Sequence, residues 1–305
     1  MRRAAAAVGS DPTAQDAAQA HLDAGGDAVG AVVSGFFAAA GDSPGVLFGP
    51  LGLLVAQIGV GVRAFDGRQR QPGLGARRAR GLMAEDAVPV AARVGVPSSI
   101  AAVLVALRYG RSAPLSKIMS AGVSLAKKAG CDRRADVLEQ IGRLGAAALA
   151  SQAIARPLIH LAGPSEGGAL GLGDLEAIPE LDHVAGASAS QRFVPWLHDR
   201  IDASQMPESE WQAQVLRQHG LCACDAGGGV AALCYDNAIS GLRVDALELV
   251  LPLYAVPARR GAARVAPGRF LPAPAPLYVD VSSSDTPVTA TVALAERPPL
   301  TVRAL

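Results

Sequence analysis

The side chains best suited to chemistry in this sequence lie close together in residues 218–225, which read Gln-His-Gly-Leu-Cys-Ala-Cys-Asp. A cysteine thiol can attack a carbonyl carbon once a base or a free α-amine activates it, so Cys222 is a candidate nucleophile. Cys222 and Cys224 would point to one face of a strand, and with His219 and Cys234 they could bind zinc. The Cys-x-Cys spacing is not typical of zinc sites, and buried cysteines usually pack as small apolar groups. We therefore expect no metal and no cofactor.

Two kinds of element must position these residues. The first half predicts helices, because Asp11 and Asp27 can cap apolar segments that recur at helical spacing and end at glycines. The second half predicts strands, which are short apolar runs between turn residues. The expected helices span residues 12–24, 28–40, 98–109, 115–129, 134–144 and 146–162. The expected strands span residues 45–48, 51–58, 60–65, 215–224, 230–235, 247–253, 277–281 and 288–293. Helices followed by a block of strands predict an α+β layered fold.

The overall composition argues against several classes of partner. A formal net charge of +1 gives no field that would attract nucleic acid or an anionic membrane. Residues 43–62 are uncharged and long enough to cross a bilayer, but glycines and prolines interrupt them, so two strands joined by a glycine-rich turn fit better. The apolar run after Arg3 is too short for a signal peptide. We therefore predict a cytoplasmic protein that binds neither nucleic acid nor a membrane.

Five segments, in order along the chain, resemble motifs of the gamma-glutamyltranspeptidase family. Residues 12–31 are similar to its opening helix pair, with Asp27 and Gly30 in place of the asparagine and the aspartate of Gly-Gly-Asn-Ala-Val-Asp-Ala. Residues 64–72 are similar to a strand that ends in Leu-Asp-Gly-Arg-Glu-Thr-Ala-Pro. The other three segments are residues 94–110, 168–175 and 271–279. The resemblance implies a four-layer αββα sandwich of the N-terminal-nucleophile hydrolase type, truncated at the C-terminus.

The same resemblance divides the chain into three parts that form one folded unit. Residues 1–182 are similar to the large subunit of this self-cleaving family, residues 183–212 to a connector, and residues 213–305 to the start of the small subunit. In this family, cleavage frees a threonine at the start of the small subunit. The threonine hydroxyl is then the nucleophile and its α-amine the base for γ-glutamyl transfer and glutathione hydrolysis.

The residues that this chemistry requires are replaced in the present sequence. The nucleophile position falls at Gln218, or at Arg217 if the alignment shifts by one residue, and neither side chain can attack a carbonyl. Pro272 and Ala273 stand where the family has two serines. Residues 250–254 contain no carboxylate to hold the amine of a substrate. We therefore predict that the family's catalytic activity has been lost.

Arg68 is the exception, because it matches the arginine that clamps the α-carboxylate of the substrate. A guanidinium suits that role through its bidentate geometry. The alternative for Arg68 is a solvated arginine at the end of a strand.

We therefore predict an inactive gamma-glutamyltranspeptidase-like protein that binds a γ-glutamyl small molecule, or assembles with itself or with an active relative. The shortened C-terminal strands should leave an apolar sheet face or edge that needs cover. The alternative function is an active γ-glutamyl hydrolase or transferase that acts on glutathione or related compounds through Cys222. A third interpretation is a structural protein whose alanine-rich helices resemble the family by composition alone, which would not explain the turn Asp66-Gly67-Arg68.

Overall fold

The computed structural model describes residues 5–57, 61–75, 88–110, 113–177, 182–184, 192–193, 218–256, 265–271, 278–282, 289–293 and 298–303. Its α-helices are α1 (Pro12–Asp23), α2 (Ala28–Asp42), α3 (Ser99–Ala106), α4 (Leu115–Lys128), α5 (Asp132–Leu144), α6 (Gln152–Ala162) and α7 (Leu172–Glu176). Short 3-10 helices are η2 (Val90–Arg93), η3 (Leu107–Tyr109), η4 (Gly145–Ala150) and η5 (Pro164–Glu166). The strands are β1 (Ala6–Gly9), β2 (Leu51–Gln57), β3 (Gly61–Gly67), β4 (Asp182–Val184), β5 (Arg192–Phe193), β6 (Gln218–Cys224), β7 (Val230–Asp236), β8 (Leu242–Val244), β9 (Leu249–Leu251), β10 (Tyr278–Ser282), β11 (Thr289–Ala293) and β12 (Leu300–Arg303).

The strands form one large sheet, a second sheet beneath it and a small hairpin. The large sheet has the order β1-β6-β7-β2-β3-β4, and the second has the order β12-β11-β10-β5. All of their neighbouring strands are antiparallel. Since β6 and β7 lie between β1 and β2, the helix-rich and strand-rich parts of the chain share this large sheet.

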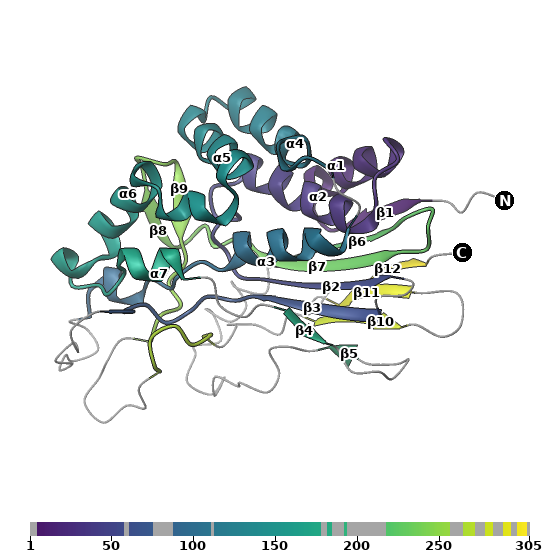
Figure 1. Cartoon of the computed structure of the whole chain (residues 1–305). Helices are drawn as coiled ribbons and strands as arrows, with labels where there is room; N and C mark the ends of the chain where they lie inside the picture. Colours follow the sequence, from purple (N-terminus) through teal and green to yellow (C-terminus); the bar gives the residue numbers. More distant parts are fainter. Residues whose placement is uncertain are drawn as a thin grey trace.

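Three layers are visible in the described ranges (Figure 1). Helices lie over one face of the large sheet, and the second sheet lies against its other face. Alternating side chains of β6 and β7 therefore enter two different cores. One core, beneath the helices, contains Leu221, Leu233 and Tyr235. The other, between the two sheets, contains Cys222 and Cys234.

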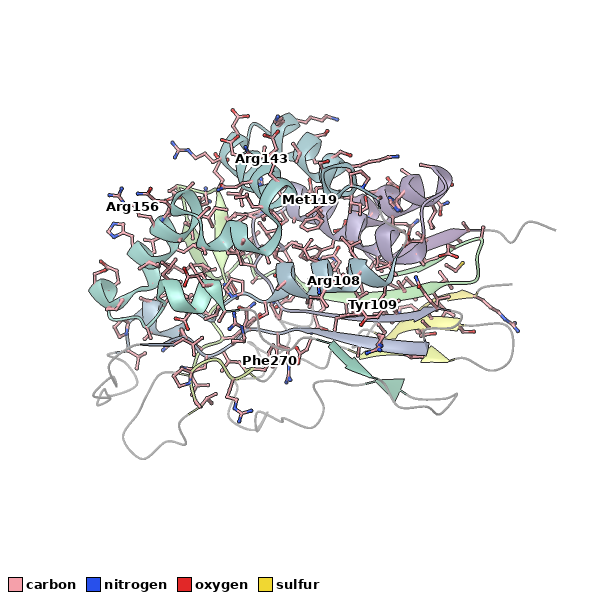
Figure 2. All side chains as sticks on the ribbon, viewed as in Figure 1. Arg108, Tyr109, Met119, Arg143, Arg156 and Phe270 are labelled. Carbon is pink, nitrogen blue, oxygen red and sulfur yellow. The ribbon has the colours of Figure 1, made fainter. Side chains whose placement is uncertain are left out.

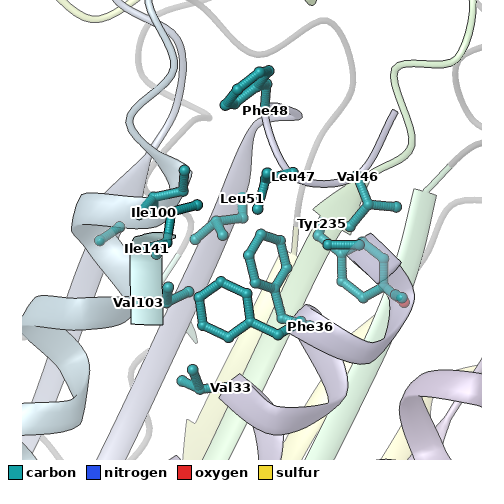
Figure 3. Packing of buried hydrophobic residues seen from close by; sticks show 14 of the residues in the cluster. Val33, Phe36, Val46, Leu47, Phe48, Leu51, Ile100, Val103, Ile141 and Tyr235 are labelled. Carbon is teal, nitrogen blue, oxygen red and sulfur yellow. The ribbon is translucent and has the colours of Figure 1, made fainter. Parts of the chain in front are cut away.

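The core beneath the helices is built around α2, which is apolar on nearly every face. Phe36 of α2 packs edge-on against Tyr235 of β7, with ring centroids 6.0 Å apart, and Figure 3 shows both side chains in the cluster that also contains Leu51 and Val33. Within the described chain, Ala28 to Gly41 are all buried. This extensive burial explains why so uniform a helix is stable, since helices that are apolar all round must be enclosed.

The α1–α2 connection forms as the sequence predicts. Asp11 accepts hydrogen bonds from the backbone N–H groups of Thr13 and Ala14, and the next residue, proline, begins α1. The His21 imidazole lies where a Cβ at Gly26 or Gly30 would approach it to 2.2 or 2.4 Å. Glycine at these two positions therefore allows α1 and α2 to enclose a histidine between them.

Asp225 joins the β6–β7 hairpin to the start of α2. Its Oδ1 accepts hydrogen bonds from the N–H groups of Gly227 and Gly229 at 2.7 and 3.0 Å. Its Oδ2 accepts one from the N–H of Ala28 at 3.1 Å. A single buried carboxylate thus shapes a tight turn and caps a helix that lies almost 200 residues earlier in the sequence.

Most of the predicted elements are confirmed, with several differences. Residues 45–48 form turns instead of a strand, and the N–H of Gly49 donates back to the carbonyl of Val46 at 3.0 Å. The helix predicted over residues 146–162 is interrupted at Ser151, whose extended backbone separates η4 from α6. Strand β1 was not predicted, because its alanine-rich sequence carries no strand signal of its own. The short strands β4, β5, β8 and β12 were not predicted either. Residues 58–60 and 215–217, at the ends of predicted strands, lie outside the described residues.

The expected apolar face on the C-terminal strands is not found on β11 and β12. Their inward residues are Ala290, Val292 and Val302, which are buried against the large sheet. The outward positions of these strands include Thr291 and Thr301, whose Oγ1 atoms lie 3.0 Å apart. A hydroxyl-bearing outer surface can be hydrated, so this part of the second sheet does not require a covering layer. Separately, the described helices include none with the length and hydrophobicity needed to span a bilayer.

Candidate functional site

Two of the predicted site residues, Gln218 and Arg68, lie in one row across the large sheet. Gln218, the first residue of β6, is paired with Asp236, the last residue of β7. The N–H of Asp236 donates to the carbonyl of Pro50, just before β2, and Arg68 follows the β3 residue that pairs with Leu51. Three strand spacings of about 4.8 Å place the backbones of Gln218 and Arg68 roughly 14 Å apart. The sheet thus brings together residues that are 150 positions apart in sequence.

This row faces the space between the two sheets. Residues of the same parity as Gln218 in β6, such as Cys222, are buried in the core between the sheets. The same holds for Cys234 in β7 and for Ala64 in β3. Because side chains alternate along a strand, Gln218, Asp236 and Asp66 belong to this inner face.

Arg68 is buried and held by Asp66, so the interpretation as a solvated arginine is wrong. Only 6% of the residue is exposed. Its Nε lies 3.1 and 3.0 Å from the two carboxylate oxygens of Asp66, and its Nη2 lies 2.8 Å from Oδ2. The guanidinium carbon also lies 5.4 Å from the ring centroid of Phe270, which Figure 2 shows below β3. The arginine is therefore fixed in position, with one edge of its guanidinium occupied by a carboxylate.

Asp236 provides a second carboxylate in the row. It is 2% exposed, and the hydroxyl of Tyr254 donates a short hydrogen bond to its Oδ2. Gln218 beside it is 3% exposed. Sequence reasoning missed Asp236, although its place at the end of a strand opposite Gln218 would have indicated it once the pairing was known. The row therefore contains an amide, a carboxylate with its phenol partner, and an ion pair, but no serine, threonine or cysteine.

Cys222 lies in the middle of β6, two positions further inside the sandwich than Gly220. It is fully buried, and its Sγ lies 3.6 Å from the carbonyl oxygen of Leu300. Burial raises the pKa of the Cys222 thiol to about 12, with a hydrogen bond to the backbone of Val292 partly opposing the shift. At neutral pH this side chain is a protonated thiol, and the thiolate is the reactive form. Its surroundings are those of a packing residue.

The other cysteines and the histidine do not converge on a metal-like arrangement. His219 faces the helices, where its ring stacks on Tyr235 with centroids 5.4 Å apart, whereas Cys222, Cys224 and Cys234 face the second sheet. Burial raises the pKa of both Cys224 and Cys234. Within the described ranges, no group of three or more histidine, cysteine or acidic residues is arranged to hold a metal ion.

His21 has a perturbed pKa away from the row. Burial between α1 and α2 lowers the pKa of the imidazole, which the charge of Asp27 partly opposes and that of Lys117 reinforces. This histidine serves helix packing. Of the other predicted positions, Arg217, Pro272 and Ala273 lie outside the described residues.

No family model matches the chain, and no curated protein matches its sequence. Solved structures do share its architecture. The structure described as LmbA2991HD aligns with 95% of this chain and 79% of its own, with a TM-score of 0.65 at 14% identity. A cephalosporin acylase from Bacillus halodurans aligns with 98% of this chain and 77% of its own, with a TM-score of 0.60 at 13% identity. A gamma-glutamyltranspeptidase from Helicobacter pylori aligns with 56% and 62%, with a TM-score of 0.45 at 22% identity. The first two alignments span nearly the whole chain and establish a shared fold.

Proposed function

We propose that this protein, which has the N-terminal-nucleophile hydrolase fold predicted from its sequence, is a non-catalytic binding protein that acts as a single uncut chain. Its ligand is a small γ-glutamyl compound held at the end of the large sheet. The observation that carries the proposal is the start of β6. There, Gln218 and its neighbours in the row include no side chain that could form an acyl-enzyme.

The row is nevertheless suited to binding. Arg68 is held in place by Asp66, and a guanidinium suits a carboxylate through its planar, bidentate donor geometry. Asp236 adds an acceptor two strands away from Arg68 in the row, bonded to Tyr254. A ligand that carries both a carboxylate and an amine would find a side chain of opposite charge at each of these two positions. Glutamate and its γ-amides have this combination of groups.

The active alternative requires Cys222 as nucleophile, and the geometry favours it less. Self-cleavage before Cys222 would cut β6 in its middle and remove four residues from the pairing with β7. Burial would also have to be relieved before the thiol could lose its proton. For these reasons we place the non-catalytic function first.

Intact mass measured under denaturing conditions after prolonged incubation tests the loss of chemistry. We expect one species at 30.9 kDa, and no release of nitroaniline from γ-glutamyl-4-nitroanilide above the buffer rate. Two fragments split between residues 217 and 222 would refute the proposal, and the new terminal residue would identify the nucleophile.

Thermal unfolding with added glutathione or L-glutamate tests the binding function. A ligand at 100 times its Kd stabilises the native state by about 2.7 kcal/mol, which raises Tm by roughly 5 °C in a chain of this size. We expect this rise in the unmodified protein and in the matched control Arg63→Met, which alters an arginine within β3. It should be absent in a folded variant that lacks Arg68, such as the double variant described below. No rise in the unmodified protein would exclude these ligands.

A further inference from the structure

Strand β1 lies at the edge of the large sheet, and half of its backbone groups point away from the sheet. Among the described strands, its one neighbour in the sheet order is β6. The N–H of Ser10 donates to the carbonyl of Gly220, which continues the β1–β6 ladder by one pair. In an antiparallel ladder, hydrogen-bonded pairs alternate with pairs whose groups face outward. The N–H groups of Ala7 and Gly9 therefore face away from β6.

These two outward N–H groups are occupied by side chains of α1. The N–H of Ala7 donates to Oε1 of Gln19 at 2.9 Å, and the N–H of Gly9 donates to Oε1 of Gln15 at 2.8 Å. The amide of Gln19 is held in turn, because its Nε2 donates to Asp23 at 2.8 Å. Figure 1 shows α1 beside β1.

The match between helix and strand follows from their repeats. Gln15 and Gln19 are four residues apart, which is about 6.0 Å along a helix. Ala7 and Gly9 are two residues apart, which is about 6.8 Å along a strand. Two glutamine amides at this helical spacing can therefore satisfy successive outward donors of the edge strand.

We infer that Gln15 and Gln19 form a built-in guard that prevents a second copy of this chain from pairing with β1. An unprotected edge strand presents a row of donors and acceptors to any other strand. The partner that this edge fits best is β1 of another copy, because antiparallel pairing of identical strands gives a closed two-fold dimer. The guard fills the donors of that interface with side chains of the same molecule, so self-association is blocked at this edge.

The test is the double variant Gln15→Ala/Gln19→Ala, examined by size-exclusion chromatography with light scattering over a range of concentrations. Alanine preserves the helix, so α1 should remain folded. We expect a concentration-dependent dimer under conditions in which the unmodified protein is monomeric. A double variant that remains monomeric throughout would overturn the inference.

Further variants identify the surface involved. Adding Ala7→Pro removes an outward donor that the β1–β6 ladder does not use, so the triple variant should return to a monomer. A triple variant that still dimerises would refute pairing through β1. The variant Gln15→Glu/Gln19→Glu retains acceptor oxygens and should stay monomeric, as should the control Gln140→Ala/Gln152→Ala, which removes two glutamines of α5 and α6.

Hydrogen exchange of the unmodified protein tests the guard independently of whether the variants fold. The amides of Ala7 and Gly9 should exchange more slowly than unprotected edge amides, by roughly tenfold or more. Exchange at the rate of an exposed amide would contradict the inference.

Discussion

Replacing Arg68 by methionine should destabilise the protein strongly, because it would leave Asp66 as a buried carboxylate without its cation. Asp66 is 3% exposed and receives three guanidinium contacts of 2.8–3.1 Å, together with one hydrogen bond from the N–H of Arg68 at 3.0 Å. The variant Arg68→Met removes the three contacts and keeps only the backbone bond. Removal of one partner from a buried ion pair typically costs about 3–5 kcal/mol.

The double variant Asp66→Asn/Arg68→Met removes both charges and should lose far less stability. Replacement of a whole buried pair by neutral groups is often close to neutral, so we expect a loss of about 0–1 kcal/mol. The difference between the two variants should therefore be roughly 3 kcal/mol. Urea unfolding at pH 7, followed by circular dichroism, measures both values.

The result of this cycle also bears on the binding function. If Arg68→Met lowers the free energy of unfolding by less than about 1 kcal/mol, the pair does not act as a buried structural unit and the reasoning from burial fails. In either case, a folded double variant is the protein without Arg68 that the ligand experiment requires.

Three further predictions concern packing, thiol reactivity and pH. Gly122→Ala should destabilise the protein by roughly 1–3 kcal/mol or more, because a Cβ there would lie 2.1 Å from a backbone carbonyl oxygen of α2. Gly142→Ala, whose Cβ would have its nearest neighbours 3.7 Å away, should instead stabilise the protein by about 0.5–1 kcal/mol. Thermal unfolding measures both changes. Iodoacetamide at pH 8 should modify partly exposed Cys131 and spare buried Cys222 in the native protein, and peptide mass spectrometry that finds rapid labelling of Cys222 would contradict its burial. Burial lowers the pKa of His21 below its ordinary value of 6.5, so the unfolded state binds more protons than the native state. The free energy of unfolding should therefore fall as pH decreases through 6.5. Urea titrations at several pH values should show a smaller pH dependence for His21→Gln.

The helices could be predicted because their signals are local. Asp11 followed by proline marks the start of α1, and the glycines that end α1 are immediately adjacent in sequence. The fold class followed from the order of helices and strands together with the family motifs, and the solved structures confirm it. The residues that determine the helix boundaries and the family motifs each lie within short stretches of sequence.

The elements that could not be predicted depend on distant partners. Strand β1 has only four residues and becomes a strand because β6, more than 200 positions later, supplies its hydrogen bonds. Asp236 enters the candidate site only because β7 pairs with β6 in a particular register. The burial of Arg68 likewise depends on Phe270, which lies 200 residues away in sequence. No local pattern contains this information.

The interleaved order of the large sheet has a consequence for any molecule cut between β4 and β6. The N-terminal fragment would supply β1 and β2, and the C-terminal fragment would supply β6 and β7, which lie between them. The C-terminal pair β6-β7 would then be held on both sides by strands of the N-terminal fragment, so the two pieces would remain one particle without a peptide bond between them. A nicked molecule would migrate in native gels as an intact one, and only denaturant would separate the halves. A broken peptide bond between β4 and β6 would therefore not by itself unfold or dissociate the molecule.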